Sequence, residues 1–320
     1  MAVYTQIDDA ALDQFLARYE IGTLLSFAGI AEGVENSNYL LRTDAENYIL
    51  TLYEKRVNEA ELPYFIGLMQ HLSAAGLQCP VPITDKDGDI LQQLSGRPAA
   101  MVSFLNGTSK RFPNPKQCFA LGQTLAQFHL LSADFEMTRK NGLGPDDWTA
   151  LLGSIDTSPE GMPENLLASA ADKLSAIVAQ WPDNLPSGAI HADLFPNNVL
   201  FVGDELTGVI DFYFACHDLY AYDLAVCLNS WCFDSDGSFN ITKSTALIKG
   251  YQTGRPLEAD EIDSLAILCS GAAMRFFLTR LYDWIHTPAD ALVKPLNPLE
   301  YWQKLRIHEK AQSPQAYGIW

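Results

Sequence analysis

The sequence predicts an α+β fold in two lobes, a small lobe at residues 1–105 and a larger, mainly helical lobe at residues 106–320. The chain has 320 residues, which is long enough for two lobes with a substantial buried core. Short apolar runs separated by turn residues fill much of the first hundred positions, as is typical of antiparallel strands. From Cys118 onward, apolar residues recur at helical spacing instead.

The small lobe is predicted to contain two helices and five short antiparallel strands. Apolar residues at helical spacing mark a leading helix at residues 8–19, which Gly22 closes. Asn58, with Glu61 three positions later, is typical of the cap of the second helix. Two hairpin turns are predicted at Asp87-Gly88 and at Ser95-Gly96, and the strands at residues 24–28, 37–42, 48–53, 90–94 and 99–104.

The larger lobe is predicted to consist mainly of helices. Residues 258–284 are apolar nearly all round, which is typical of a helix or helix pair buried in a core. Residues 138–163 are rich in Gly, Pro, Asp and Ser, so we interpret them as an insertion or cap loop. Other helices are expected around residues 118–128, 167–181 and 299–305.

Charge and composition exclude several classes of partner. The 21 basic and 39 acidic residues give a formal charge of −18, which repels nucleic acids and anionic membranes at long range. The six cysteines form no C-x-x-C pair, which favours a reducing compartment. The first residues do not resemble a signal peptide, and no apolar run is long enough to span a membrane. We therefore expect a soluble, cytoplasmic protein with no nucleic-acid or membrane partner; the sequence does not give its oligomeric state.

Four polar residues stand at fixed spacing within residues 190–212, where three short apolar runs alternate with loops. His191 and Asp193 come first, and Asn198 follows five residues after Asp193. Asp211 follows thirteen residues after Asn198, at the end of the last apolar run. Because two hairpin-linked strand ends carry them, we expect the carboxylates and the amide to converge. A carboxylate can accept a hydroxyl proton, and carboxylate and amide oxygens suit Mg²⁺, so the pattern predicts a phosphoryl-transfer site.

This segment resembles the catalytic loop of kinases related to aminoglycoside phosphotransferases and choline kinase. Other stretches are similar to the type of homoserine kinase that belongs to that superfamily, and the resemblance runs from near residue 20 to about residue 305. It implies a bilobal protein-kinase-like fold with ATP and Mg²⁺ between the lobes. The other stretches are residues 29–39, 49–56, 211–216 and 274–282.

The resemblance implies a role for each residue of the motif. Asp193 is expected to orient the acceptor hydroxyl and to accept its proton, and His191 to brace the catalytic loop. Asn198 and Asp211 are expected to hold the Mg²⁺. The small-molecule substrate is implied to be L-homoserine, phosphorylated by ATP to O-phospho-L-homoserine on the way to threonine.

Nucleotide contacts are implied in the small lobe. The loop between the first two strands would cover the phosphates, although its glycines do not fit G-x-G-x-x-G and a plain hairpin turn is an alternative. The strand that carries a phosphate-binding lysine in kinases has Thr51 at that position, and Lys55 or Arg56 is either a phosphate ligand or a surface charge. Backbone groups near Ser103 either bind adenine at a hinge or belong to an ordinary strand exit. The predicted nucleotide-binding residues are Gly33, Asn36, Ser37, Asn38, Thr51, Ser103 and Leu105.

Three charged residues outside the motif are given roles. Arg275 lies in an apolar segment, and a buried guanidinium needs an anion. That anion is either an internal carboxylate or the acceptor's carboxylate, and we predict the latter. Asp218 is predicted to bind the acceptor's ammonium group. Asp223, which opens a helix, is predicted to hold the backbone of the catalytic loop.

Two alternatives remain open. A kinase for choline, an aminoglycoside or a sugar would share the motif, and a choline site would need an aromatic cage. A non-catalytic nucleotide-binding protein would explain Thr51, but it would have no need of both carboxylates and the amide. The aromatic residues that offer a cage, or that pack in the core, are Tyr213, Phe214, Tyr220, Trp231 and Phe233.

Overall fold

The computed structural model of the chain divides into two compact units. The first comprises Met1–Asn106 and Asp290–Val293, and the second comprises Gly107–Ala289 and Lys294–Trp320. The structure describes residues 4–30, 36–54, 58–157, 159, 161–288, 291, 293–311 and 313–320.

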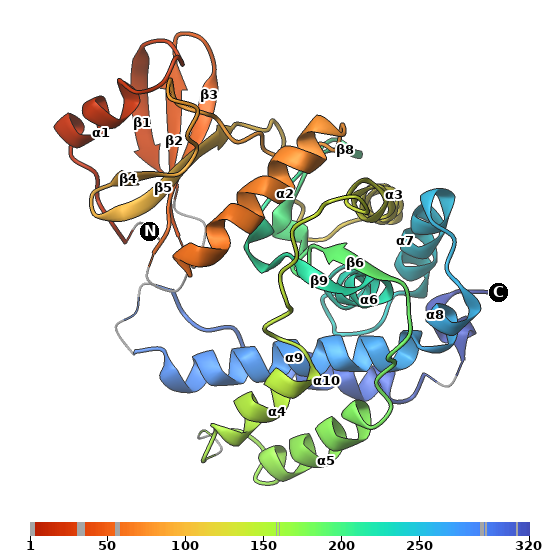
Figure 1. Cartoon of the computed structure of the whole chain (residues 1–320). Helices are drawn as coiled ribbons and strands as arrows, with labels where there is room; N and C mark the ends of the chain where they lie inside the picture. Colours follow the sequence, from red (N-terminus) through yellow and green to blue (C-terminus); the bar gives the residue numbers. More distant parts are fainter. Residues whose placement is uncertain are drawn as a thin grey trace. The chain divides into compact units, whose positions relative to one another are not determined.

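The first unit is built on an antiparallel sheet with the strand order β1-β2-β3-β5-β4 (Figure 1). Alternate residues of β2 are buried, as expected for a strand with one face on a core. Leu41 of this face shares a core cluster with Leu12 of helix α1 (Asp9–Leu16). The predicted five-stranded sheet is therefore confirmed. The strands are β1 Leu24–Gly29, β2 Ser37–Thr43, β3 Asn47–Leu52, β4 Gln92–Leu94 and β5 Arg97–Ser103.

One of the two hairpins predicted for this unit is wrong. The turn at Asp87-Gly88 does not join two strands: residues 75–91 are all described, and none of them belongs to a strand. The Asp85 carboxylate accepts the backbone N–H groups of Asp87 and Asp89 instead. Such a bond between a side chain and its following backbone closes the turn locally, so the turn needs no paired strands.

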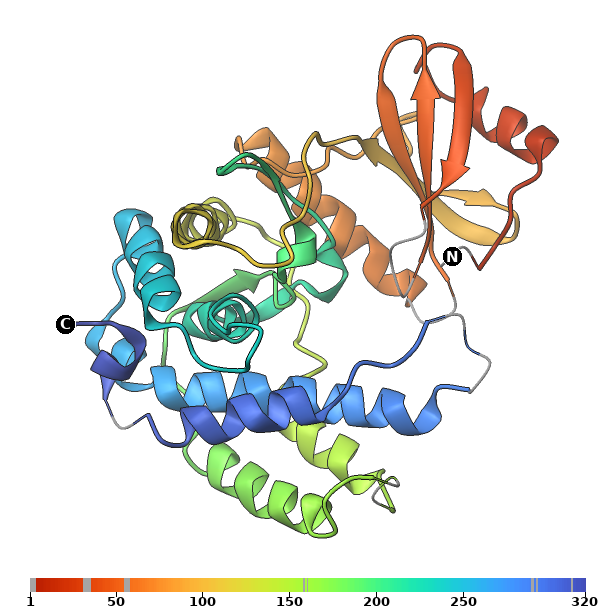
Figure 2. The same ribbon diagram turned by 180° about the vertical axis from the view of Figure 1, so that it is seen from behind.

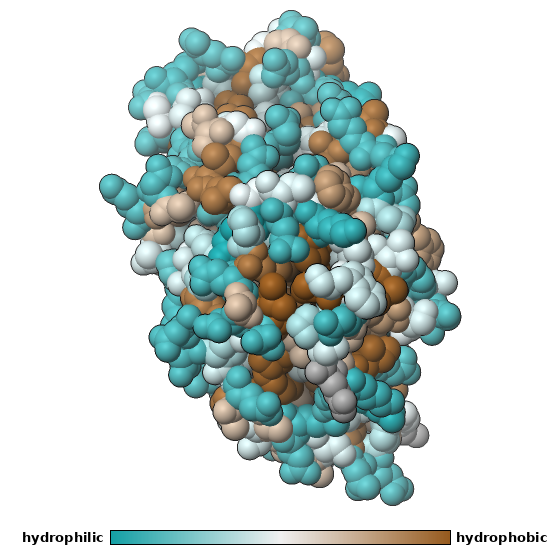
Figure 3. All heavy atoms as spheres, turned by 90° about the vertical axis from the view of Figure 1, so that its right-hand side faces the viewer, coloured by the Kyte–Doolittle hydropathy of each residue, from teal (hydrophilic) through white to brown (hydrophobic). Residues whose placement is uncertain are grey.

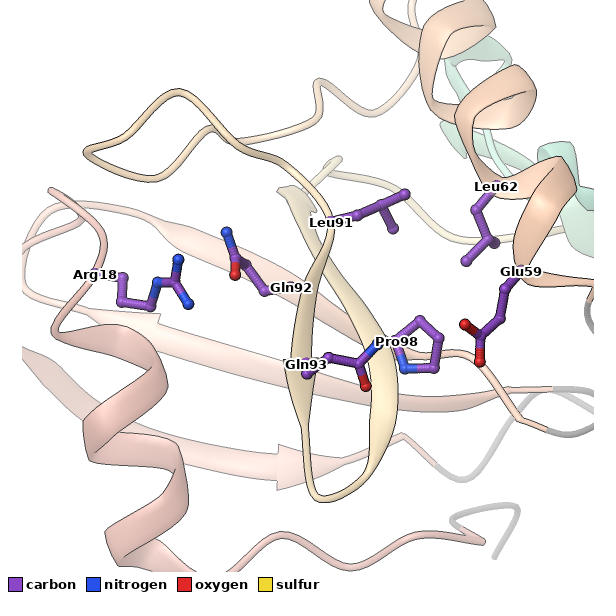
Figure 4. Close-up of a pocket in the computed structure, with 7 residues that line it drawn as sticks. All are labelled: Arg18, Glu59, Leu62, Leu91, Gln92, Gln93 and Pro98. Atoms are coloured by element: carbon purple, nitrogen blue, oxygen red, sulfur yellow. The ribbon is translucent and has the colours of Figure 1, made fainter.

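The second predicted helix is confirmed as α2 (Leu62–Ala74), which follows a 3-10 turn, η1 (Glu59–Glu61). Asn58 caps this segment by accepting the N–H of Ala60. A cavity of about 340 Å³ lies where this segment meets the edge strand β4. None of its lining residues is a predicted site residue. Figure 4 shows them: Arg18, Glu59, Leu62, Leu91, Gln92, Gln93 and Pro98.

The second unit is mainly helical and contains two short β-pairs (Figures 1 and 2). Strand β6 (Ser187–Ile190) pairs with β9 (Cys216–Leu219), and β7 (Val199–Val202) pairs with β8 (Glu205–Val209). The helices are α3 Pro115–Leu131, α4 Pro145–Gly153, α5 Leu166–Val178, α6 Tyr220–Trp231, α7 Ile241–Gly254, α8 Ala259–Asp263, α9 Leu265–His286 and α10 Leu299–His308. The 3-10 turns are η2 Pro196–Asn198, η3 Phe212–Phe214 and η4 Pro314–Tyr317.

Helix α9 is the central helix of this unit. It contacts α4, α5, α6 and α10, and both ribbon views show α10 alongside it (Figures 1 and 2). Among the described residues it is the one helix long and apolar enough to cross a membrane, but 72% of its most apolar segment is buried inside the protein. It is therefore the core helix that residues 258–284 predict.

On the face shown in Figure 3, hydrophilic residues surround a smaller group of hydrophobic ones near the middle.

A helix occupies part of the segment that the sequence predicts to be a cap loop. Helix α4 has Pro145 at its first position, where the missing N–H costs nothing. The Asp147 carboxylate accepts the N–H of Gly144, just before the helix. Trp148 is completely buried and holds α4 on the core. The loop prediction is wrong here because Gly, Pro and Asp serve as helix-start residues.

Two glycines bring helices α3 and α7 into backbone contact. A Cβ atom added at Gly122 would collide with the carbonyl oxygen of Leu247, and one added at Gly250 would collide with that of Phe119. We expect Gly122→Ala to lower the free energy of unfolding by about 2 kcal/mol, because a rigid backbone has to move. Urea unfolding followed by tryptophan fluorescence measures this loss. Gly153→Ala is the matched control, since a Cβ there meets nothing within 4 Å and should leave the unfolding midpoint unchanged or slightly higher.

Candidate active site

The loop at residues 191–198 lies between two strands, because β6 leads into it and β7 leads out of it. Ala192 has a φ of 61°, a left-handed backbone conformation that is uncommon for a residue with a Cβ. The carbonyl of Leu194 accepts a hydrogen bond from the indole Nε1–H of Trp231 at 2.8 Å. The loop is therefore a sharp turn fastened to helix α6.

The peptide groups of Ile210 join this loop to Asp211. The N–H of Ile210 donates to the carbonyl oxygen of Asn198 at 2.9 Å. The carbonyl oxygen of Ile210 accepts from Nε2 of His191 at 3.1 Å. Both main-chain groups of Ile210 are thus bound by loop residues, and Asp211 follows directly. The predicted convergence of the loop with Asp211 is observed.

Both ring nitrogens of His191 have partners. Nε2 donates to Ile210, and Nδ1 accepts the N–H of Asp193 at 3.3 Å. The side chain is 0% exposed, and its burial lowers the pKa of His191, which keeps the ring neutral. A neutral ring with its donor and its acceptor both occupied shapes the loop and has no proton to exchange with a ligand.

Two carboxylates and one amide interact at the loop: Asn198 is bonded to the Asp193 carboxylate, and the charge of that carboxylate acts on Asp211. The amide nitrogen of Asn198 donates to the carbonyl oxygen of Asp193 at 2.8 Å and to Oδ2 of its carboxylate at 3.3 Å, which leaves the amide oxygen for a cation. Solvent reaches Asp211, yet the surrounding protein and, secondarily, the Asp193 carboxylate raise the pKa of Asp211 to about 7. A cation between the carboxylates would remove this repulsion.

The chemistry of these donors fits Mg²⁺. Carboxylate and amide oxygens are hard ligands, and Mg²⁺ is usually held by one or two carboxylates together with water and phosphate oxygens. In the part of the chain that the structure describes, no group of three or more His, Cys, Asp or Glu side chains is placed to hold a metal. A magnesium site at this loop therefore depends on the amide oxygen of Asn198 as well as on the carboxylates.

Asp223 supports the loop from helix α6, as the sequence predicts. Its carboxylate accepts the backbone N–H of His191 at 2.8 Å and that of Ala192 at 2.9 Å. Burial alone would raise the pKa of Asp223. The hydrogen bond from His129 and the electrostatic interactions with His129 and His191 instead hold this pKa below its usual value. His129 in turn contacts the hydroxyl of Tyr251 at 2.8 Å. The role of His129 was not predicted; its polar ring on an apolar helix face is the signal in the sequence.

Arg275 contacts the same loop from helix α9. Its Nη1 donates to the carbonyl oxygen of Ala192 at 2.5 Å, and the residue is 2% exposed. Among the described residues, no salt bridge involves Arg275. The sequence predicts either an internal carboxylate or the acceptor's carboxylate as the partner of Arg275. The structure shows a backbone carbonyl oxygen bound to the guanidinium instead.

Asp218 is not brought to the loop. In the β6–β9 ladder it lies opposite Gly188, whereas Cys216 lies opposite Ile190, the last residue before the loop. At about 3.3 Å per residue, Asp218 is roughly 7 Å further along the ladder than Cys216. Its carboxylate accepts from Asn141 at 2.6 Å and lines a cavity of about 180 Å³.

The predicted nucleotide-binding side chains at the ends of β2 and β3 have hydrogen-bond partners within the first unit. The hydroxyl of Ser37 donates to the Glu54 carboxylate at 2.7 Å and accepts two backbone N–H groups, so it is fully used. The hydroxyl of Thr51 donates to the amide oxygen of Asn38 on the neighbouring strand at 2.7 Å. Asn36 accepts the N–H of Glu54 at 3.2 Å. These residues fix the ends of β2 and β3.

The predicted hinge residues lie at the end of strand β5. The N–H of Ser103 donates to the carbonyl oxygen of Val81, and its hydroxyl accepts the N–H of Val81, both at 2.9 Å. Leu105 follows the strand and is half-buried. The predicted residues Gly33, Lys55 and Arg56 lie outside the described residues.

Residues 26–257 match the phosphotransferase enzyme family. The chain is 54% identical to a homoserine kinase of Parvibaculum lavamentivorans over 319 residues, which covers 100% of this chain and 99% of the relative. It is also 54% identical to a homoserine kinase of Azorhizobium caulinodans, with the same coverage.

Solved structures share the fold at low sequence identity. An amicoumacin kinase in complex with AMP-PNP, Ca²⁺ and Ami has a TM-score of 0.70 at 13% identity, covering 96% of this chain and 95% of that one. A spectinomycin phosphotransferase in complex with ADP and spectinomycin has a TM-score of 0.67 at 16% identity, covering 98% and 97%. These likenesses confirm the predicted kinase-like α+β fold. The chain belongs to the phosphotransferase enzyme family and, within it, to the group whose curated members are named homoserine kinase.

Proposed function

We propose that this phosphotransferase moves the γ-phosphoryl group of ATP to the side-chain hydroxyl of L-homoserine and so makes O-phospho-L-homoserine, on the way to threonine. The full-length relatives named homoserine kinase support the acceptor. The observation that carries the chemistry is the pair of hydrogen bonds on the Ile210 peptides, which tie the 191–198 loop to Asp211.

Asp193 has the central role in this proposal. Its carboxylate would accept a hydrogen bond from the acceptor hydroxyl, orient that oxygen towards the phosphoryl group, and take up the proton as the new bond forms. Its backbone N–H is bound to His191, and its carbonyl is bound to Asn198. Because this backbone is fixed and Oδ2 of Asp193 accepts from the Asn198 amide at 3.3 Å, the carboxylate loses little orientational freedom when the acceptor binds.

Asn198 and Asp211 would hold a magnesium ion through the amide oxygen and the carboxylate. When bound, Mg²⁺ neutralises the charge that develops on the phosphate oxygens during transfer. Asp211 directly follows Ile210, whose peptide groups are bonded to the loop, and it has a left-handed backbone with a φ of 67°. The two residues would bind the ion from the loop and from the end of β8.

The first unit would bind the nucleotide. Thr51 stands where kinases carry a phosphate-binding lysine, and its hydroxyl is bonded to Asn38, so its role would be to fix the β2–β3 pair beside the phosphates. Lys55 and Arg56 remain the candidate phosphate ligands. Backbone groups at Ser103 and Leu105 remain the candidates for adenine.

The contacts to the two ends of the amino-acid acceptor stay predictions. Arg275, predicted for the carboxylate, is already bonded to the loop. Asp218, predicted for the ammonium group, lies along β9 away from the loop and is bonded to Asn141. A cytoplasmic location, with neither nucleic acid nor membrane as a partner, completes the proposal.

Choline is the less favoured acceptor, because three of the five aromatic residues predicted to form a cage are engaged with separate partners. Trp231 donates to the Leu194 carbonyl. Tyr220 stacks on His129, with 4.6 Å between ring centroids, and Phe233 packs against Phe239 at 5.2 Å. A cage requires aromatic faces that converge on one cation, and these rings are turned to other partners.

A panel of hydroxyl compounds tests the proposed acceptor. Purified protein with ATP and Mg²⁺ should phosphorylate L-homoserine with a kcat/KM at least about 100-fold above those for choline and an aminoglycoside, because a site that pairs buried polar groups rejects acceptors that leave them unpaired. Phosphorus NMR identifies O-phospho-L-homoserine as the product. A preference for choline, or equal use of all the acceptors, contradicts the proposal.

A further inference from the structure

The backbone on both sides of Ala192, just before Asp193, is held by side chains of two helices. Asp223 on α6 binds the N–H groups of His191 and Ala192, and Arg275 on α9 binds the carbonyl oxygen of Ala192. Ala192 itself adopts the left-handed conformation, which is unfavourable for a residue with a Cβ. Such a conformation persists only where its surroundings determine it. Here the hydrogen bonds with Asp223 on α6 and Arg275 on α9 fix the backbone in this conformation.

The surroundings of Arg275 are unusual for a structural arginine. Its guanidinium carbon lies 4.5 Å from the ring centroid of Phe276 and 5.7 Å from that of Phe214. Its Nε has no hydrogen-bond partner among the described residues. A buried cation without a paired carboxylate is costly, whereas a core arginine normally pairs with an acidic side chain. The Arg275 charge also interacts with the Asp193 carboxylate and with Tyr222, so the surroundings of the guanidinium direct it at the loop.

The carbonyl of Ala192 and the N–H of Asp193 belong to the same peptide group. A donor fixed to this oxygen, together with the His191 ring on the N–H, sets the plane of the peptide from which the Asp193 side chain projects. Rotation of this plane would displace the Asp193 carboxylate from the acceptor hydroxyl. Displacements of about 1 Å at a reacting group can cost roughly 100-fold in rate.

We propose that Arg275 is a positioning residue, which holds the Ala192–Asp193 peptide from helix α9 so that the Asp193 carboxylate meets the acceptor hydroxyl. This role rests on the proposed function, in which Asp193 is the base. It differs from the carboxylate-binding role predicted for Arg275, because the guanidinium would act through Asp193 and would not touch the substrate.

Steady-state kinetics of Arg275→Lys and Arg275→Ala test the proposal. Both variants should lose roughly 100-fold or more in kcat while the KM values for homoserine and ATP change less than about threefold, since only alignment is lost. Guanidinium added to Arg275→Ala should restore part of kcat, because the small cation fits the vacated site. Arg280→Lys is the matched control: Arg280 lies on the same helix, is paired with Glu300, and should keep wild-type kinetics.

Three results overturn the proposal. A homoserine KM raised by tenfold or more, with kcat largely kept, would make Arg275 a ligand of the acceptor's carboxylate. Kinetics close to wild type in both variants would remove any role in the reaction. Failure of Arg275→Lys to fold, judged by circular dichroism, would make Arg275 a folding residue. The proposed function is judged separately, because a wild-type protein that does not phosphorylate homoserine refutes it before any variant is compared.

Discussion

Asp193→Ala is expected to lower kcat for homoserine phosphorylation by roughly 1,000-fold or more, because both the orientation of the hydroxyl and the acceptance of its proton are lost. Binding of ATP should persist, since the predicted metal ligands Asn198 and Asp211 stay in place. Stopped assays of product formation measure the rate, and calorimetry with an ATP analogue and Mg²⁺ measures the nucleotide affinity. The pair of measurements separates loss of chemistry from loss of binding.

A second acidic residue provides the control for this variant. Asp183 is exposed in the segment before β6, so Asp183→Ala removes one carboxylate from the same unit without touching the loop. Its turnover should equal that of the wild type. Turnover in Asp193→Ala within a factor of about three of the wild type would contradict the base assignment, and the choice of Asp193 as the central residue would then be wrong.

Asp211→Asn is expected to have two opposite effects. It should remove the increase in melting temperature that Mg²⁺ and ATP together give the wild type, and lower kcat by roughly 1,000-fold, because a carboxylate ligand of the ion is lost. In metal-free buffer with EDTA, however, the same variant should be more stable than the wild type at alkaline pH. Asn also tolerates the left-handed backbone at this position, so no new strain is introduced.

The sign of the pH effect follows from the raised pKa. In the folded protein the pKa of Asp211 is about 7, against an ordinary value of 3.8. Between these values the folded state holds a proton that the unfolded state has released, so the stability of the wild type falls as the pH rises from about 4 to about 7. Above that window the loss is complete. The gain from Asp211→Asn should therefore be larger at pH 8.5 than at pH 5.5.

Thermal unfolding in EDTA at these two pH values checks the effect. Solvent reaches Asp211, so the pH effect on stability should be smaller than it would be for a fully enclosed carboxyl group. Asp204→Asn removes an exposed carboxylate from the tip of the same hairpin and should show no comparable difference between the two pH values. A gain from Asp211→Asn that is the same at both values, or a loss at pH 8.5, would show that neither burial nor the Asp193 charge raises the pKa of Asp211 in the absence of the ion.

The sequence was sufficient to predict the convergence of the loop with Asp211. Two apolar runs joined by a tight turn have to return to their starting level, so the residues at their open ends meet whatever the rest of the fold does. The spacing between Asn198 and Asp211 was therefore enough to predict that the two residues lie close together. The same applies to Asp223, since a carboxylate in the first turn of a helix is well placed for nearby backbone N–H groups.

Contacts between distant segments were beyond the reach of the sequence. A buried arginine requires a partner, but only the packing of α9 decides that the partner is the carbonyl of Ala192. Strand β9 has four residues and no alternating pattern long enough to predict it, so the displacement of Asp218 along the β6–β9 ladder was hidden. The internal bond between Thr51 and Asn38 likewise depends on which strands are neighbours and in which register.

Ile210 contributes only main-chain atoms to its bonds with Asn198 and His191, and this restricts how the β7–β8 hairpin can change during evolution. Side chains at position 210 are free to vary as long as the peptide keeps its N–H, so proline is the substitution that the joint forbids. Residues added in pairs beyond the Gly203 turn would lengthen both arms and leave the open end intact. The hairpin already absorbs one extra residue, Thr207, at a bulge in β8. A single deletion elsewhere in one arm would turn Asp211 to the opposite face, so outside this bulge related proteins should differ in hairpin length mainly by even numbers.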